Sequence, residues 1–257
     1  MNRFQFITSK IRNQWYKLIP PPEIPDNPRA SDVYFVDWFR SGNIWLRAIF
    51  YKLITKKDID FDNLQEILPD IHVSKHLPDT NFYPFPRIIK SHSPYNKHYH
   101  RVVYLVRNPR SSIISFYFYF KEGRGKDVGS ISQFLRGENG IISWCQHVRG
   151  WKNKYQVLIK FEDLKKNTKK EVTKILDFLD INLTDQEIDA AISSASFKHL
   201  KELEQKSKIW KNQHKFQANF SSLRKGSVYE WRTILNKEDL NFINQQLIKY
   251  KIYEWIR

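Results

Sequence analysis

The spacing of apolar residues along the chain predicts its secondary structure. Four short runs rich in Val, Ile, Tyr and Leu are almost continuously apolar, at 32–38, 86–91, 101–107 and 155–161. Such runs are typical of strands buried on both faces, as in a parallel sheet. Longer segments repeat their apolar residues every three or four positions and are expected to be helices. These segments are 43–54, 109–120, 130–137, 139–154, 165–179, 184–195 and 236–250.

The order of these elements indicates the fold class. Strands that alternate with helices predict an α/β fold, with a central, mainly parallel sheet flanked by helices. A length of 257 residues suits a single domain, so we expect residues 1–257 to form one. Within it we expect an N-terminal amphipathic helix and Pro-rich connector, a core and a C-terminal helix, at 1–30, 31–235 and 236–257. Two polar stretches with little periodicity, 55–85 and 205–223, are expected to be lids or binding loops.

The N-terminal segment combines apolar residues at helical spacing with basic ones over residues 3–19. Packing on its own domain is the simpler interpretation, and peripheral contact with a membrane surface or a partner is the alternative. No uncharged run approaches the roughly 18 residues that a membrane-spanning helix needs. We therefore expect a protein that does not span a membrane.

Composition and charge narrow the class of ligand. The chain has 43 Lys and Arg against 27 Asp and Glu, a net charge of +16, which favours an anionic partner. Its 41% apolar residues are enough for a full core, which excludes a disordered chain. Cys145 is its one cysteine and cannot form an intrachain disulfide, so we expect a cytoplasmic location. The oligomeric state has no signal in the sequence.

Anion-binding residues follow two of the predicted strands. Residues 40–43 (Arg-Ser-Gly-Asn) connect the first strand to its helix, and residues 107–112 follow the third strand, with Ser115 behind them. In a parallel sheet these turns share one edge, where helix N-termini offer free N–H groups to an anion. The two segments therefore predict two anion cradles, and two cradles imply a ligand with two anionic ends.

A histidine is expected between the two cradles. The second strand ends in Lys90-Ser91-His92, so neighbouring strands of similar height would place His92 at the same edge. Histidine titrates near neutral pH and is the usual general base for a hydroxyl or amine nucleophile. A structural or solvated histidine is the alternative interpretation of this residue.

A series of segments, in order over roughly residues 33–235, resembles the sulfotransferases that use 3′-phosphoadenosine 5′-phosphosulfate (PAPS), of the cytosolic or bacterial type. The segments are WFRSGNIW, RIIKSHSPY, VVYLVRNPRSSIISFYFYF, ISQFLRGENGIISWCQHVRGW, FEDLKKNTKKEVTKILDFLDINLTDQEID, SSASFKHLKE and RKGSVYEWR. The first is similar to the family's YPRSGNTW-like loop, the second to its RxxKTHLP segment and the last to its RKGxxGDWK segment. The resemblance implies the P-loop-like sulfotransferase fold.

The resemblance also implies roles for single residues. His92 is expected to be the catalytic base, Arg40 the catalytic cation and Lys90 a second cation near the sulfuryl group. PAPS, the expected co-substrate, would be bound by Arg40, Ser41, Gly42, Asn43 and Ile44 at the 5′ end, Trp45, Phe161 and Phe197 at the adenine, and Arg107, Ser115, Arg224, Lys225 and Gly226 at the 3′-phosphate.

Three positions depart from the family pattern. Ile44 and Ala195 stand where the family has threonine, and Phe161 stands where it has tyrosine. At residue 44 the contact to the 5′-phosphate must then come from backbone N–H groups. The adenine contacts near Phe161 and Ala195 are expected to be more apolar.

The expected reaction is transfer of the sulfuryl group to a hydroxyl or amine of a small-molecule, lipid or glycan acceptor. Positioning and fixed cations can supply most of the acceleration, so no metal is expected. We expect the loops 55–85, 121–130 and 205–223 to hold the acceptor, with possible lining aromatics at Phe82, Tyr83, Phe85, Tyr95, Trp210 and Phe216.

Two other classes of protein share some of these features. A basic nucleic-acid- or anion-binding protein without catalysis would have the same charge and aromatic content. Its basic residues would line one exposed face, however, so we expect no nucleic-acid partner. A nucleotide kinase on a related fold would normally carry a GK[ST] loop, which is missing here.

Overall fold

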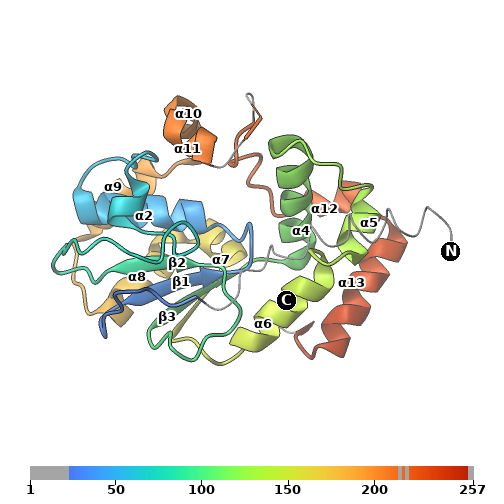
Figure 1. Cartoon of the computed structure of the whole chain (residues 1–257), viewed down its shortest axis with the longest axis horizontal. Coiled ribbons are helices and arrows are strands. Elements are labelled where there is room, and N and C mark those ends of the chain that lie inside the picture. Colours follow the sequence, from blue (N-terminus) through green and yellow to red (C-terminus); the bar gives the residue numbers. More distant parts are fainter. Residues whose placement is uncertain (1–22, 214–215, 218–219, 254–257) are drawn as a thin grey trace.

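A four-stranded parallel sheet forms the centre of the computed structural model, which describes residues 23–213, 216–217 and 220–253. Its strands are β1 (Val33–Asp37), β2 (Ile88–Ser91), β3 (Val102–Val106) and β4 (Val157–Lys160). The spatial order is β2-β1-β3-β4 (Figure 1). The parallel sheet and α/β fold predicted from the continuous apolar runs are thus confirmed.

The helices bury both faces of the sheet. They are α2 (Asn43–Thr55), α3 (Leu64–Ile67), α4 (Pro109–Phe118), α5 (Ile131–Arg136), α6 (Ile141–Trp151), α7 (Phe161–Lys166), α8 (Thr168–Leu179), α9 (Asp185–Ser194), α10 (Phe197–Lys206), α11 (Lys208–Gln213), α12 (Trp231–Ile234) and α13 (Lys237–Lys249). Phe35 and Leu105 share one core cluster with residues of α2, α8 and α9. Val36 and Tyr104 share the second with residues of α4, α6 and α13. Neighbouring strand residues point to opposite faces, so both faces need apolar side chains.

The helix predicted at 165–179 is in fact two helices. The Asn167 side chain accepts the backbone N–H of Lys170 and so caps the start of α8. The helix before it begins at Phe161, directly after β4, rather than at residue 165. The predicted strand 155–161 is therefore shorter, and Phe161 belongs to a helix N-terminus. Beyond α4, residues Tyr119–Gly123 form a π-helical turn, η1.

The prediction of a binding loop without helices at 205–223 is wrong over its first half. Helix α10 ends at Lys206 and α11 covers Lys208–Gln213. Most side chains of α10 are charged or polar, and among its residues only Leu200 and Glu204 are buried. The apolar repeat on which the sequence interpretation depended is therefore weak here.

The two ends of the chain are only partly described. The predicted N-terminal helix at 3–19 lies outside the described residues, and the division at residue 30 stays a prediction. The predicted C-terminal helix 236–257 is shorter, because α13 ends at Lys249. Within the described ranges, no helix combines the length and hydropathy required to cross a bilayer.

Candidate active site

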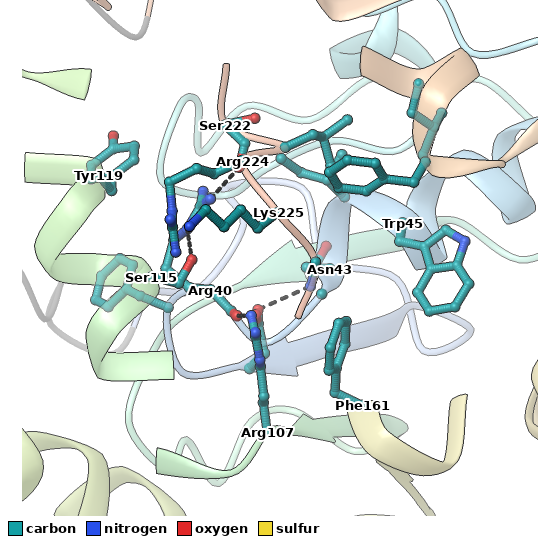
Figure 2. Close-up of a pocket in the computed structure, with 18 of the residues that line it drawn as sticks. Arg40, Asn43, Trp45, Arg107, Ser115, Tyr119, Phe161, Ser222, Arg224 and Lys225 are labelled. Carbon is teal, nitrogen blue, oxygen red and sulfur yellow. Dashed lines mark hydrogen bonds between the residues drawn. The ribbon is translucent and has the colours of Figure 1, made fainter. Parts of the chain in front are cut away.

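A cavity of about 570 Å³ lies at the carboxyl ends of the strands. Its wall brings together the loop after β1, the ends of β2 and β3, helices α4 and α7, and segment 222–230. Most of the residues singled out from the sequence line it (Figure 2), namely Arg40, Gly42, Asn43, Ile44, Trp45, Lys90, His92, Arg107, Ser115, Phe161, Phe197, Arg224, Lys225 and Gly226. Ser41 is the exception, since its hydroxyl is buried and donates to the backbone oxygen of Trp38 at 2.6 Å.

The loop after β1 is tightly wound against α7. Arg40 has a φ of 67° and Gly42 a φ of 105°, both in the left-handed region. A Cβ atom on Gly42 would lie 2.6 Å from the Phe161 ring, so glycine is required by contact as well as by conformation. Gly42 caps α2 without a side-chain hydrogen bond, and within the described part of the chain the N–H groups of Asn43 and Ile44 donate to no side-chain cap. This helix start is therefore open to an anion.

Arg40 crosses the cavity wall toward α4. Its Nε donates to Ser115 Oγ at 3.2 Å, and its guanidinium also donates to the backbone oxygen of Ser222. The guanidinium lies 5.4 Å from the centre of the Tyr119 ring. Burial lowers the pKa of Arg40 from its usual value. No carboxylate of the described residues pairs with it, so its positive charge is only partly compensated.

Arg107 occupies the corresponding position after β3. It donates to the backbone oxygens of Arg40 at 3.1 Å and Ser227 at 2.7 Å, and stacks 4.4 Å from the Phe161 ring centre. Its Nε is buried and has no hydrogen-bond partner among the described residues. Burial lowers the pKa of Arg107 to about 10. Both cavity arginines thus bond to backbone carbonyls where an anion could supply stronger acceptors.

The second predicted cradle is only partly correct. The N-terminus of α4 is closed, because the Asn108 side chain accepts the backbone N–H of Arg110. The Arg110 guanidinium turns to Asn244 of α13, at 2.8 Å, and Ser111 donates to the backbone of residue 228. Only Arg107 and Ser115 of this predicted group face the cavity.

His92 lies at the end of β2 and is held on three sides. Its Nδ1 is 3.0 Å from both the backbone oxygen and the carboxylate of Asp37. Its backbone N–H donates to His72 Nε2 at 2.7 Å. The Phe39 ring lies 4.4 Å away, centre to centre. The remaining ring nitrogen, Nε2, has no hydrogen-bond partner among the residues that the structure describes.

Lys90 is less free than the sequence suggested. Its ammonium group forms an ion pair with Asp70 at 2.5 Å, although it also lines the cavity. Burial opposes ionisation of Asp70, but Lys90 and the neighbouring histidines hold the pKa of its carboxyl below the usual range. The charge of Lys90 is therefore shared between Asp70 and the cavity.

The segment 220–227 closes one side of the cavity and is anchored by Glu204. This buried carboxylate accepts the hydroxyls of Ser221 and Ser222, the Ser222 backbone N–H at 2.9 Å, and Trp210 Nε1 at 3.3 Å. Beyond Ser222, Arg224 and Lys225 both pair with Glu230, the latter at 2.9 Å. Their charges are partly neutralised without a ligand, unlike those of Arg40 and Arg107.

Aromatic side chains make up much of the cavity wall. Trp45 and Phe161 meet edge to face at 6.1 Å, and the Arg107 guanidinium lies over the Phe161 ring. Six further rings line the wall, and the first of them contacts His92: Phe39, Phe116, Tyr119, Phe120, Trp210 and Phe216. Of the aromatics expected at the acceptor, only the last two belong to this lining.

The other expected acceptor aromatics lie elsewhere. Phe85 belongs to the core, Phe82 packs against it, Tyr83 is 91% exposed, and Tyr95 contacts Trp151. Loops 55–85 and 121–130, both fully described, contribute no lining residue. The prediction that they hold the acceptor has no support from the cavity. Four rings from residues 39 and 116–120 were missed, because their apolar pattern indicates only core packing.

The sequence interpretation also missed Asp37 and Glu204. Asp37 ends an otherwise apolar buried strand and directly precedes the first cradle, and a charge at such a position is a usable signal. Glu204 lies among many charged residues of α10, so nothing in the sequence distinguishes it. Across the described part of the chain, no group of His, Cys, Asp and Glu side chains has the arrangement of a metal site.

The chain is similar to known sulfotransferases over most of its length. An amine sulfotransferase of Oryctolagus cuniculus is 28% identical over 247 residues, covering 86% of this chain and 82% of that protein. A 3-alpha-hydroxysteroid sulfotransferase of Cavia porcellus is 29% identical over 255 residues, covering 88% of each.

Solved structures show the same fold. A mouse sulfotransferase in complex with PAP superposes with a TM-score of 0.66 at 21% identity, covering 90% of this chain and 87% of the other. A retinol dehydratase in complex with retinol and PAP superposes with a TM-score of 0.68 at 16% identity, covering 87% and 82%.

A family model supplies the assignment. The model of the sulfotransferase domain matches residues 31–255, which include β1 to β4 and every residue that lines the cavity. This match favours the predicted family over a nucleic-acid-binding protein or a nucleotide kinase. The chain therefore belongs to the sulfotransferase family and is a sulfotransferase enzyme.

Proposed function

We propose that the protein transfers the sulfuryl group of PAPS to a hydroxyl or amine of a small-molecule acceptor, with His92 as the general base. The observation that carries the proposal is the cavity itself, which gathers Arg40, Arg107, His92 and the open start of α2 at one sheet edge. Two of the similar proteins are named for acceptors of these two kinds, an amine and a hydroxysteroid. Lipid or glycan acceptors, and a cytoplasmic location, stay predictions.

The two cavity arginines suit the two anionic ends of PAPS. The buried, unpartnered Nε of Arg107 and the nearby Ser115 fit a 3′-phosphate, with Arg224 and Lys225 close by. The uncapped N–H groups of α2 and the Arg40 guanidinium fit the 5′-phosphosulfate. The edge-to-face pair of Trp45 and Phe161 offers apolar surface for adenine.

Arg40 and Lys90 would act electrostatically in this mechanism. Charge develops on the departing phosphate oxygen during sulfuryl transfer, and a fixed guanidinium in a buried site stabilises it. Arginine stays protonated at neutral pH, so Arg40 contributes charge and hydrogen bonds rather than a proton. His92 lines the cavity, and its Nε2 would take the proton of the acceptor.

Donor binding is the first test of the proposal. PAP, 3′-phosphoadenosine 5′-phosphate, should raise the thermal midpoint more than ATP or adenosine 5′-phosphate, because only PAP reaches both arginines. The stabilisation should be about 2.7 kcal/mol at a hundredfold excess over the dissociation constant. Equal shifts with all three nucleotides would contradict the assignment.

The role of His92 requires a separate test. His92→Ala should lower the transfer rate by about 10² to 10⁴ with a screened acceptor, while PAP affinity and the thermal midpoint change little. His92→Gln keeps a polar side chain and should be equally slow. Near-normal turnover in either variant would show that another group takes the proton.

A further inference from the structure

The base proposed above is in direct contact with a buried carboxylate. Asp37 is the last residue of β1, and its side chain is 1% exposed. One carboxylate oxygen and the backbone oxygen of Asp37 both lie 3.0 Å from His92 Nδ1. Both atoms are acceptors, so Nδ1 must carry the hydrogen. In the neutral ring Nε2 is then unprotonated, and this is the nitrogen that has no hydrogen-bond partner among the described residues.

The surroundings of Asp37 suit an ionised carboxylate that lacks a full partner. Its Oδ1 accepts Asn43 Nδ2 at 3.0 Å, and Asn43 is fixed at the start of α2. Its Oδ2 is buried without a hydrogen bond in the part of the chain that the structure describes. A buried negative charge is costly unless a positive charge compensates it. An imidazolium at His92 would provide that compensation.

Other charged groups near His92 are paired with one another or neutral. Lys90 is paired with Asp70. The His72 ring accepts the His92 backbone N–H, and burial lowers its pKa to about 3. His147 lies behind the same strand end, and burial lowers its pKa to about 4. Asp37 is the carboxylate in contact with the His92 ring.

We propose that Asp37 is a positioning residue that holds the His92 imidazole with its hydrogen on Nδ1 and stabilises the imidazolium formed during transfer. The proposal rests on the function proposed above. As the acceptor oxygen or nitrogen forms its bond to sulfur, its proton passes to His92 Nε2. The bond between sulfur and the bridging phosphate oxygen breaks, and PAP leaves with that electron pair. The new positive charge lies on a ring whose other nitrogen faces Asp37.

Asp37→Asn tests the charge without changing the shape of the side chain. The backbone oxygen of residue 37 still accepts the Nδ1 hydrogen, so nitrogen NMR should report the same His92 tautomer as in the wild type. The maximal rate kcat should fall by about 10- to 10²-fold, a part of the roughly 10²- to 10⁴-fold that a general base supplies. The acid limb of the kcat profile should move to lower pH, because a nearby negative charge favours the protonated ring. PAP affinity should not change.

Asp32→Asn is the matched control at the other end of the strand. Asp32 is equally buried and pairs with Arg87 at 2.8 Å, far from the cavity lining. This variant should be less stable than the wild type. The acid limb of its kcat profile should lie at the same pH as in the wild type. An unchanged limb in Asp37→Asn, or a loss of rate that only follows the folded fraction, would overturn the proposal.

The outcomes separate this proposal from the proposed function. If the wild type neither binds PAP nor transfers sulfuryl groups, the proposed function is wrong. If the wild type is active and His92→Gln is slow, but Asp37→Asn retains the rate and the acid limb, only the role of Asp37 is wrong.

Discussion

The two edges of the parallel sheet use buried arginine in opposite ways. At the amino edge, Arg87 donates to both carboxylate oxygens of Asp32, at 2.9 and 2.8 Å, and both side chains are almost fully buried. At the carboxyl edge, the buried Arg107 and the partly buried Arg40 bond instead to backbone carbonyls and lie over aromatic rings. The first arrangement is a complete ion pair within the protein. The second leaves positive charge for a ligand.

Two histidines show a similar contrast, the buried His147 and the partly exposed His92. Both ring nitrogens of His147 have partners, Tyr104 Oη at 2.9 Å and the backbone oxygen of Ser93 at 3.0 Å. His92 has partners at Nδ1 alone among the described residues. Arg87 and Arg107 are equally buried, so the acceptors that face each guanidinium, and not burial, distinguish these two arginines.

The largest expected effect comes from breaking the complete pair. Arg87→Met leaves Asp32 as an uncompensated buried charge, which should lower the free energy of unfolding by about 3 to 5 kcal/mol. Denaturant titration measures this loss. PAP affinity of the folded variant should equal that of the wild type. A variant of normal stability would show that the pair is no structural anchor.

The second largest effect concerns His147, because acid should lower the stability of the folded protein through this residue. Burial lowers the pKa of His147 from 6.5 to about 4 in the folded state. The unfolded chain then binds more protons between these values, so stability is fully present above pH 6.5 and is lost as pH falls toward 4. The loss should be on the order of 3 kcal/mol. His147→Gln should show a flatter dependence of unfolding free energy on pH, and an unchanged slope would contradict this account.

An open arginine should behave differently from Arg87. Arg107→Met should weaken PAP binding by about 1.5 to 3 kcal/mol, because a charge-assisted contact is lost. The stability of the unliganded protein should change little, because the two hydrogen bonds lost to backbone carbonyls offset the removal of a buried charge. Calorimetry with PAP measures the first effect, and adenosine 5′-phosphate, which lacks the 3′-phosphate, is the control ligand. Equal weakening of both nucleotides would place the 3′-phosphate elsewhere.

The smallest expected effect tests whether the start of α4, unlike that of α2, takes no part in ligand binding. Asn108→Ala removes the cap of α4 and should lower stability by about 1 kcal/mol. Because this start is closed by its own side chain, PAP affinity should stay the same. A clear loss of PAP affinity would mean that the start of α4 binds the ligand, as the sequence first suggested.

Much of the fold could be predicted from local pattern. The strands of a fully buried parallel sheet have continuous apolar runs, and all four were found. Helix α10 escaped prediction because only two of its residues are buried. Asn167 divides a predicted helix through a single side-chain bond, which apolar spacing does not reveal.

The location of the site could be predicted more readily than the contacts that its side chains make. Strand ends meet at one edge whatever their side chains do, so the positions of Arg40, His92 and Arg107 followed from topology and resemblance. The direction of a side chain depends on its neighbours. Arg110 turns away to α13, and Ser41 turns inward, although both lie in predicted cradles.

Backbone carbonyls of segment 220–227 occupy the guanidinium N–H groups that the proposed ligand would use. Ser222 and Ser227 belong to one short stretch of backbone, and their carbonyl oxygens bond to Arg40 and Arg107 respectively (Figure 2 shows Arg40 beside Ser222). A phosphate that takes the same N–H groups gains the difference between a charged and a neutral acceptor, not a whole new bond. Under the proposed function, release of the product would return both guanidinium groups to these partners. This competition would favour turnover over tight retention of the product.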